Sequence, residues 1–423
     1  MIRTQEPLLG KPEKISIPEP EKILLANGIP LYCINTGEQE IIKLEIVFNA
    51  GEWYSDFPIL MTAINDLMDE GTKAKSAFEI AEAFDFYGAY LQTECTHDIA
   101  SIKLFTLTKF AKQTFELLLE ILQDAIFPDK EIEIYKAQNI QKLKINKQKV
   151  DYLTRKEFGE ALFGKTHPYG RRIEEENYVG LNRALLSKGY QSFYHHKNCF
   201  IILAGKISEQ TKKITSEIFG SWKSGDNFSL QNKIYKSDTS SQQKIKVEKE
   251  GAVQSSIRIG KILFNRKHPD YIPITVLSTV LGGYFGSRLM TNIREDKGYT
   301  YGIGCGMVSL LNEGYFFIST QVGNDVCQAA LKEIYIEIER LRNDLIPDDE
   351  LKLVKSYLTG VFQRSIDGPM ELSEKIKTLL ISGLDITFYS QYLEKLNSVS
   401  ADELHLLGQK YFDISSLKEV VAG

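Results

Sequence analysis

The feature of this sequence that most constrains its fold is an internal repeat. Phe127-Pro128-Asp129-Lys130-Glu131-Ile132 recurs as Ile346-Pro347-Asp348-Asp349-Glu350-Leu351, 219 residues further on. Ile202-Leu203-Ala204-Gly205 likewise matches Val420-Val421-Ala422-Gly423 at an offset of 218 residues. Self-similarity at one fixed offset indicates repeated structural units. The sequence therefore predicts that the chain arose by internal duplication.

The length and composition of the chain fit two domains joined by a linker. The sequence has 423 residues, of which 43% are hydrophobic and 25% are charged, an ordinary globular composition. Residues 224–243 are rich in Ser, Asn, Asp, Gln and Lys without periodicity, which is typical of a linker. We predict a first domain at 15–223, a linker at 224–243 and a second domain at 244–423.

Local patterns predict strands followed by helices. Asn27-Gly28 is a strong hairpin signal between two short alternating runs. Ser76 and Glu79 form a capping box at the start of an amphipathic helix, and Pro128 separates two long helical patterns. The predicted fold class is α+β, with two homologous α/β sandwiches from the duplication, each an antiparallel-rich sheet packed against helices.

A segment of the second half alternates glycine with larger residues. The pattern from Tyr299 to Gly306 predicts a strand in which Gly302, Gly304 and Gly306 leave one face bare. Tyr301 would project from the other face. A bare strand face admits the close approach of a helix or of another backbone.

Charge and hydropathy exclude several classes of function. The chain has 51 basic and 56 acidic residues, a net charge of −5 and no block of like charge, which argues against a nucleic-acid partner. No run of eighteen apolar residues and no leader pattern are visible, so we expect no membrane span. The expected location is cytoplasmic, or periplasmic if a signal peptide has been removed. Five widely spaced cysteines predict neither a disulfide framework nor a thiolate metal site.

Four stretches carry a resemblance to a known family. They are Glu70-Gly71-Thr72, Ala77 to Gly88, Leu162 to Arg171, and Ser287-Arg288-Leu289 through Arg294 to Tyr301. In order and spacing they resemble the pitrilysin/insulinase family of inverted zincins, over nearly the whole chain. The resemblance implies a two-domain zinc-peptidase fold, whereas function has to be argued from the site.

The zinc motif of that family is degenerate here. Active members carry H-x-x-E-H on a helix ahead of the Gly-Thr pair, where two histidines bind zinc and the glutamate activates water. By this resemblance Thr62 and Asp66 replace the histidines, Asn65 replaces the glutamate, and Lys142 lies near the third ligand position. A hydroxyl, an amide and an ammonium group cannot assemble a tetrahedral zinc site, and an amide cannot act as general base. None of the six histidines has another three or four residues away. We expect no catalytic residue, no metal and no cofactor in this chain.

One pair of residues retains a substrate-binding pattern. Family members with a peptide chamber carry an arginine and a tyrosine seven residues apart in the corresponding segment, and Arg294 with Tyr301 matches that pair. The resemblance implies that both side chains donate hydrogen bonds to a peptide carbonyl. Alternatively, Arg294 offsets the C-terminal end of its helix dipole and Tyr301 fills core space.

The resemblance also implies an assembly. Family peptidases use four such domains, in one chain or in two, with the zinc of the first facing the arginine–tyrosine pair of the fourth. We therefore expect a non-catalytic, substrate-binding subunit that holds extended peptides in a chamber shared with a zinc-bearing peptidase subunit, as a heterodimer with zinc in the partner. The alternatives are a structural protein without a proteolytic role and a homodimer that sequesters peptides.

Overall fold

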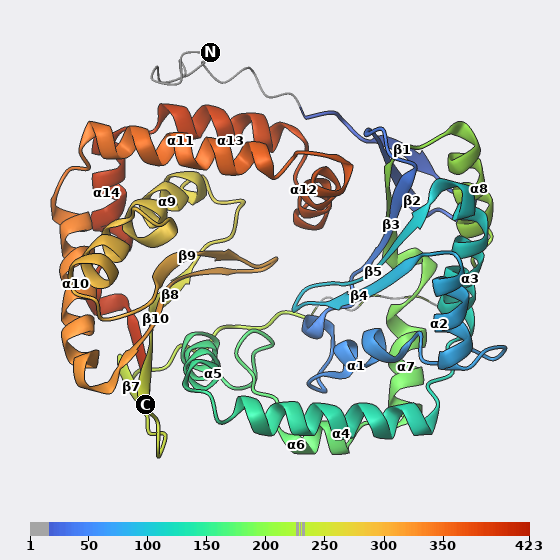
Figure 1. Ribbon diagram of the computed structural model, residues 1–423, viewed down its shortest axis with the longest axis horizontal. Coiled ribbons are helices and arrows are strands. Elements are labelled where there is room, and N and C mark those ends of the chain that lie inside the picture. The colour runs from blue at the N-terminus through green and yellow to red at the C-terminus, as the bar shows by residue number, and fades with distance from the viewer. Residues whose placement is uncertain (1–16, 226–227, 229, 231–232) are drawn as a thin grey trace, which may run out of the picture.

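The computed structural model describes residues 17–225, 228, 230 and 233–423. Within these ranges the chain forms two α/β units that face each other across the middle of the molecule (Figure 1). The predicted start of the first domain at residue 15 lies outside the described residues, as do five positions of the predicted linker.

The first sheet has six strands in the order β1-β2-β6-β3-β5-β4. Strands β2 and β6 pair in parallel and the other neighbours pair antiparallel. The strands are β1 (Glu21–Leu24), β2 (Pro30–Asn35), β3 (Ile41–Phe48), β4 (Tyr90–Cys95), β5 (Ala100–Leu107) and β6 (Cys199–Gly205).

The second sheet repeats this arrangement with five strands in the order β7-β11-β8-β10-β9. Again one pair, β7 with β11, is parallel and the others are antiparallel. The strands are β7 (Lys244–Val247), β8 (Gln254–Leu263), β9 (Ile303–Ser309), β10 (Gly314–Gly323) and β11 (Lys418–Ala422). Both units thus have the predicted α+β class with antiparallel-rich sheets.

Helices of the first half cover one face of the first sheet. Alternate residues of β3, such as Leu44 and Ile46, pack with Ile64 of α1 and Phe115 of α3 in one buried core. The predicted capping box of Ser76 is present at the start of α2. The helices are α1 (Leu60–Leu67), α2 (Ala77–Phe86), α3 (Ala111–Asp124), α4 (Asp129–Asn146), α5 (Val150–Phe163), α6 (Glu175–Val179), α7 (Arg183–Phe193) and α8 (Glu209–Gly220), with short turns η1 (Glu52–Tyr54), η2 (Thr108–Phe110) and η3 (His196–Asn198).

The second half is built in the same way. Ile257 and Ile259 of β8 pack with Leu277 of α9 and Ile334 of α10 in a second core. Its helices are α9 (Tyr271–Ser278), α10 (Cys327–Asn343), α11 (Asp348–Arg364), α12 (Pro369–Ser382), α13 (Thr387–Ser398) and α14 (Ala401–Tyr411), with short elements η4 (Thr279–Gly283), η5 (Met290–Asp296), η6 (Asn324–Val326) and η7 (Ile414–Ser416). None of the helices in the described ranges is long and apolar enough to span a membrane.

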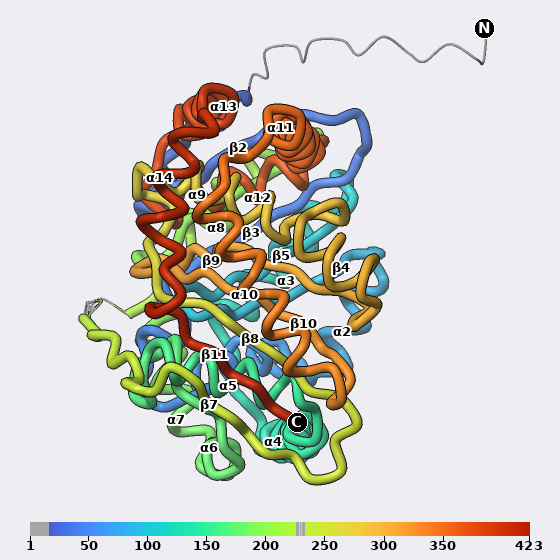
Figure 2. Tube along the Cα trace, turned by 90° about the vertical axis from the view of Figure 1, so that its left-hand side faces the viewer, coloured from blue at the N-terminus to red at the C-terminus, as the bar shows by residue number. Residues whose placement is uncertain are grey.

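Two helices are exchanged between the halves. Helix α5 packs on β8 and β11 of the second sheet, where Phe158 and Leu162 lie against Tyr315 and Val420. Helix α12, in turn, packs on β2 and β6 of the first sheet. Figure 1 and Figure 2 show α5 beside the second sheet, although it belongs to the first half of the sequence. Each unit is therefore completed by a helix from the other.

A buried ion network ties α12 to the first sheet. Lys43 and Glu45 of β3 are almost fully buried and lie 2.8 Å apart. Lys43 contacts Glu374 of α12 at 2.5 Å, and Lys377 of α12 contacts Glu45 at 2.8 Å. Burial alone would raise the pKa of Glu374, but hydrogen bonds from Lys377 and Lys43 lower it to about 2. The network therefore favours the charged form of Glu374.

The two halves also meet at hairpin turns. The β4–β5 and β9–β10 hairpins point toward each other in the middle of the molecule (Figure 1). There Asp98 accepts hydrogen bonds from the backbone N–H of Leu311 at 2.8 Å and from the hydroxyl of Tyr169 at 2.5 Å. This contact fixes the turn of the second half against the first.

One predicted strand begins later than expected. Strand β9 starts at Ile303, whereas the alternation predicted a strand from Tyr299. Tyr301 lies in a bend before the strand and is 96% exposed. The prediction was wrong at this end because the hydroxyl of Thr300 bonds with neighbouring backbone groups and stabilises a bend.

Candidate functional site

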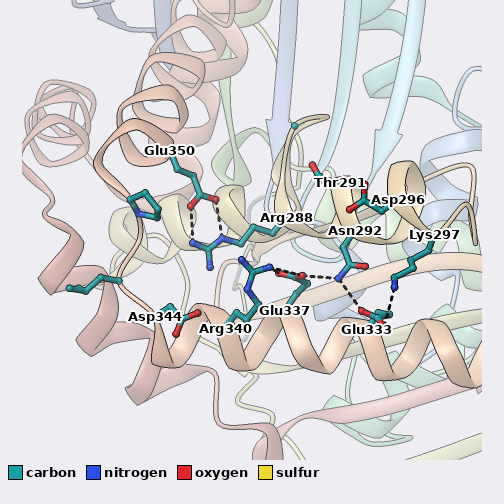
Figure 3. Close-up of a pocket in the computed structure, with 13 residues that line it drawn as sticks. Arg288, Thr291, Asn292, Asp296, Lys297, Glu333, Glu337, Arg340, Asp344 and Glu350 are labelled. Carbon is teal, nitrogen blue, oxygen red and sulfur yellow. Dashed lines mark hydrogen bonds and ion pairs between the residues drawn. The ribbon is translucent and has the colours of Figure 1, made fainter.

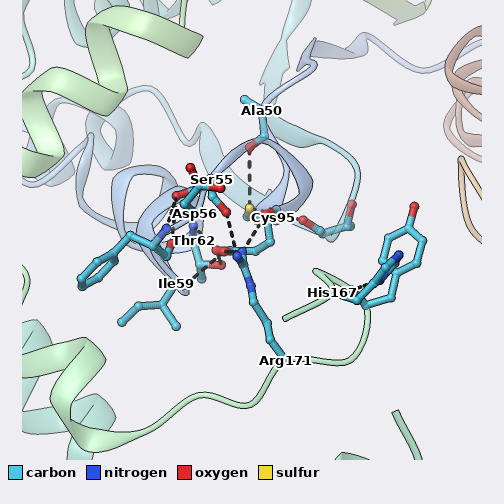
Figure 4. Close-up of polar contacts among 12 residues, drawn as sticks. Ala50, Ser55, Asp56, Ile59, Thr62, Cys95, His167 and Arg171 are labelled. Atoms are coloured by element: carbon cyan, nitrogen blue, oxygen red, sulfur yellow. Dashed lines mark hydrogen bonds and ion pairs between the residues drawn. The ribbon is translucent and has the colours of Figure 1, made fainter. Parts of the chain in front are cut away.

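The N-terminus of α1 is held by the carboxylate of Glu52, which lies in η1. The Glu52 carboxylate accepts hydrogen bonds from the backbone N–H groups of Ile59 and Thr62, both at 3.0 Å, and from the Thr62 hydroxyl at 2.8 Å. Nη2 of Arg171 lies 2.9 Å from the same carboxylate (Figure 4). Helix α1 has no side-chain cap of its own, so Glu52 binds N–H groups that its first turn would leave unpaired.

Asn65 and Asp66, further along α1, are also engaged in internal contacts. Asn65 is fully buried and its Oδ1 accepts a hydrogen bond from the Tyr194 hydroxyl at 3.0 Å. Asp66 accepts one from the Tyr135 hydroxyl at 3.1 Å. Partial desolvation by the surrounding protein raises the pKa of Asp66, although its side chain still reaches solvent. The hydrogen bond from Tyr135 and the charge of Lys142 lower the pKa and so oppose this shift.

The structure thus brings the four sequence-predicted positions of the degenerate zinc motif into one region. Thr62, Asn65 and Asp66 share α1, and Lys142 of α4 lies close enough to Asp66 to influence its titration. Within the described residues no three His, Cys, Asp or Glu side chains come together in a group that could hold a metal ion. Zinc does not fit this set, because it offers a single carboxylate beside a hydroxyl, a buried amide and an ammonium group.

Sequence reasoning missed Glu52 and Arg171, which organise this region. The Arg171 guanidinium also donates to the carbonyls of Ser55 at 2.7 Å and Glu52 at 2.6 Å. Arg171 ends one of the four stretches that carried the family resemblance. Its partner lies 119 residues away in sequence, and no local spacing connects the two.

In the second half, Arg294 lies in the last turn of η5 and has no hydrogen bond or ion pair with any described residue. Its guanidinium stands 4.6 Å from the centre of the Phe285 ring, a cation–π contact that leaves the N–H groups free to donate. The ring of Tyr301 is 96% exposed, so it fills no core space.

The bend that carries Tyr301 is fixed although the ring is free. The Thr300 hydroxyl lies 2.7 Å from the carbonyl of Gln321 in β10, and it accepts a hydrogen bond from the N–H of Gly302 at 3.1 Å. Thr320 donates to the same hydroxyl at 3.0 Å. Thr300 therefore acts as a positioning residue for Tyr301.

A charged pocket of about 560 Å³ lies beside η5 (Figure 3). Arg288 makes a two-pronged ion pair with Glu350 of α11, at 2.9 and 2.7 Å. Asn292 of η5 donates to Glu337 and Glu333 of α10, at 2.7 and 3.1 Å. These bonds anchor the segment that carries Arg294 to two long helices.

The strand that follows Tyr301 has a free hydrogen-bonding edge and glycines along one face. Strand β9 is an edge strand of the second sheet, so one side of its backbone has no partner strand in the described residues. A Cβ placed at Gly302 would meet nothing within 4 Å, and one at Gly306 would meet only the Phe317 ring, at 3.9 Å. Gly302 and Gly306 therefore lie beside open space, whereas a Cβ at Gly304 would meet the carbonyl oxygen of Gly282 at 3.4 Å.

The fold and this site define a class: a protein of two α/β units in which the helix aligned with a zinc motif by sequence carries no zinc ligand set within the described residues. The comparisons confirm the expected resemblance to the pitrilysin/insulinase family, which is the M16 peptidase family. Residues 180–358 match the family model described as the peptidase M16 inactive domain.

Relatives of known sequence agree with this assignment. The chain is 25% identical over 392 residues to an uncharacterized zinc protease, YmxG, of Bacillus subtilis, covering 91% of this chain and 94% of that protein. It is 22% identical over 403 residues to a Helicobacter pylori protein named non-peptidase homolog YmxG, covering 88% and 87% of the two chains.

Solved structures show the same fold. A peptidase M16 inactive domain from Pseudomonas fluorescens superimposes with a TM-score of 0.87 at 21% identity, covering 96% of this chain and 98% of that one. A Helicobacter pylori protease also gives a TM-score of 0.87, at 17% identity, covering 96% of this chain and 100% of that one.

Proposed function

We propose that this chain is the non-catalytic, substrate-binding subunit of an M16-type zinc endopeptidase. In this proposal it holds an extended peptide with Arg294 and Tyr301, while a separate zinc-bearing subunit of the same family supplies the metal and cleaves the peptide. The observation that carries the proposal is that neither side chain donates a hydrogen bond to any residue that the structure describes, although both backbones are fixed.

The contrast between the two candidate regions supports this division of labour. At the zinc-motif positions Thr62, Asn65 and Asp66 are all hydrogen-bonded within the protein. Arg294 and Tyr301, by contrast, have no such partners in the part of the chain that the structure describes. A guanidinium group and a phenol can both donate hydrogen bonds to a peptide carbonyl. Leaving these donors unpaired in the protein costs little free energy only while solvent reaches them.

The open edge of β9 gives the peptide a place to lie. An extended peptide can satisfy its backbone groups at a free strand edge, and bare glycine positions remove the side chains that would obstruct it. Tyr301 lies two residues before the start of this strand at Ile303. The phenol would therefore stand at one end of the bound segment.

A structural protein with the same fold and no proteolytic role is the second candidate, and a peptide-sequestering homodimer is the third. Both are consistent with the degenerate zinc motif. The structural role gives no reason for an almost fully exposed tyrosine on an anchored bend. The homodimer would bind peptides without a zinc-bearing partner.

Purification of the chain from its native source, with identification of the copurifying chains, tests the proposal. We expect a relative with an intact H-x-x-E-H motif in a stoichiometric complex that contains zinc. Recovery of the chain alone, or in an assembly without such a relative, would reject the heterodimer.

We also propose that the two halves descend from one duplicated unit, with domains at 15–223 and 244–423 joined by the linker at 224–243. The identical order of β2-β6-β3-β5-β4 and β7-β11-β8-β10-β9 supports this origin. The exchanged helices support it too, because Val150–Phe163 and Pro369–Ser382 lie at the offset that relates the repeated sequence motifs.

A further inference from the structure

Three basic side chains of α5 and β8 have no anionic partner among the described residues. They are Arg155 and Lys156 of α5 and Arg258 of β8, and no ion pair joins any of them to a described carboxylate. Two carboxylates of the same helix, Glu157 and Glu160, are both bound by Arg172. Nearby acidic groups therefore do not neutralise the cluster.

Arg155 is close enough to each of the other two cations to repel it. Burial lowers the pKa of Arg258, and the charge of Arg155 lowers it further. The pKa of Lys156 is lowered by burial and again by Arg155. Instead of anions, aromatic rings face the cations: Arg155 and Lys156 stand over Tyr152, at 5.9 and 5.8 Å from its centre. An unneutralised cluster of this kind costs stability, which a bound anion would restore.

The cluster adjoins the open strand edge described above. The Arg258 guanidinium lies 4.6 Å from the centre of the Phe317 ring, and its Nε is buried without a hydrogen-bond partner. Phe317 of β10 is paired in register with Gly306 of the edge strand β9. A Cβ at Gly306 would lie 3.9 Å from the Phe317 ring, so this ring adjoins both the bare position on β9 and Arg258.

We propose that Arg155, Lys156 and Arg258 form a carboxylate-binding site that selects acidic extended peptides lying along β9. The carboxylate comes from a Glu or Asp side chain or from the peptide C-terminus. This inference rests on the proposed function, since it specifies the class of peptide that the Arg294–Tyr301 site holds. A guanidinium group binds a carboxylate through two parallel N–H donors, so the arginines should dominate the preference.

The test uses the full chain and fluorescent peptides in matched pairs. One pair has an amidated C-terminus and differs by a central Glu or Gln, and the other has neutral side chains and a free or amidated C-terminus. We expect the wild-type chain to bind one carboxylate peptide about 10-fold more tightly than its neutral partner at low salt, with the difference shrinking at high salt. The pair that shows the difference identifies the source of the carboxylate.

Arg155→Gln and Arg258→Gln should each reduce this preference without weakening the neutral peptide. Arg155 is exposed, so its substitution leaves the fold intact. Arg258→Lys keeps the charge and should retain part of the preference, which separates binding from misfolding. Lys188→Gln is the control, because Lys188 is an exposed residue of α7 without an ion pair to a described residue. This substitution should leave the preference for the carboxylate peptide unchanged.

The outcomes separate this inference from the proposed function. Equal binding of both members of each pair, with binding still dependent on Arg294, overturns the carboxylate site and leaves the peptide-holding role standing. A preference that survives both arginine substitutions also overturns it. Absence of binding to every peptide rejects the peptide-holding role and the carboxylate site with it.

Discussion

The hydroxyl of Thr62 donates a hydrogen bond to Glu52, 2.8 Å away, at the position that the sequence resemblance aligns with the first zinc-binding histidine of the pitrilysin/insulinase family. The same carboxylate binds the N-terminus of α1 and pairs with Arg171. The position aligned with a metal ligand is therefore part of a hydrogen-bonded helix cap in this protein.

Glu52→Gln should destabilise the fold. The side chains of Glu52 and Arg171 are only 14% and 10% exposed, so the substitution leaves a buried guanidinium without its counter-charge. Breaking a buried pair in this way costs about 3 kcal/mol of unfolding free energy. Urea denaturation measures the loss. Glu209→Gln is the control that should be nearly neutral, because the Glu209 side chain is 89% exposed in its ion pair with Lys212. Equal stabilities of the two variants would show that Glu52 does not cap α1.

Restoring the zinc motif on α1 alone should not restore a zinc site. Thr62→His, Asn65→Glu and Asp66→His together supply two ligands and a base, but the third ligand position keeps the ammonium group of Lys142. The triple substitution also removes the Thr62–Glu52 bond. Elemental analysis should find no stoichiometric zinc in the triple variant, and adding Lys142→Glu should raise its zinc content. Stoichiometric, chelator-sensitive zinc in the triple variant would place the third ligand elsewhere.

Arg294→Ala and Tyr301→Phe should weaken peptide binding without affecting the fold. Losing a charge-assisted hydrogen bond costs about 1.5–3 kcal/mol and losing a neutral one about 0.5–1.5 kcal/mol, so the arginine change should have the larger effect. If both side chains hold one carbonyl, the double variant loses less than the sum of the two single losses. Peptide titrations of the four proteins, with thermal denaturation as the folding control, provide the measurement. Wild-type affinity in both single variants would favour the structural role.

The network around Glu374 should make stability depend on pH. The pKa of Glu374 is lowered from 4.5 to about 2 in the folded protein, so the folded state favours the charged carboxylate. Its contribution is therefore complete above the ordinary carboxyl pKa and is lost as the pH falls toward 2. Denaturation of wild type and Glu374→Gln should show a stability gap at pH 6 that narrows as the pH decreases to 2.5. The exposed Glu371→Gln, on the same helix and without an ion pair, should show no such gap.

The α+β class could be predicted from the sequence because the local turn and capping signals lie where the folded chain has its hairpin and its helix start. Asn27-Gly28 does connect two paired strands, and Ser76 does cap α2. The exchange of α5 and α12 could not be read from sequence, because a helix pattern shows which face is apolar and not which sheet covers it. Similarly, the Glu52–Arg171 pair joins residues that only the folded chain brings together. The β9 boundary was missed because side-chain alternation continues through a bend that Thr300 stabilises.

The most direct test of the central claim is hydrolysis of a quenched fluorescent peptide by this chain, by its zinc-bearing relative and by the two together. The account predicts no chelator-sensitive turnover by the rigorously purified chain and strong turnover by the mixture. Arg294→Ala in this chain should then lower kcat/KM of the mixture while complex formation, followed by size-exclusion chromatography, is retained. Zinc-dependent hydrolysis by this chain alone, or full activity of the mixture with Arg294→Ala, would contradict the account.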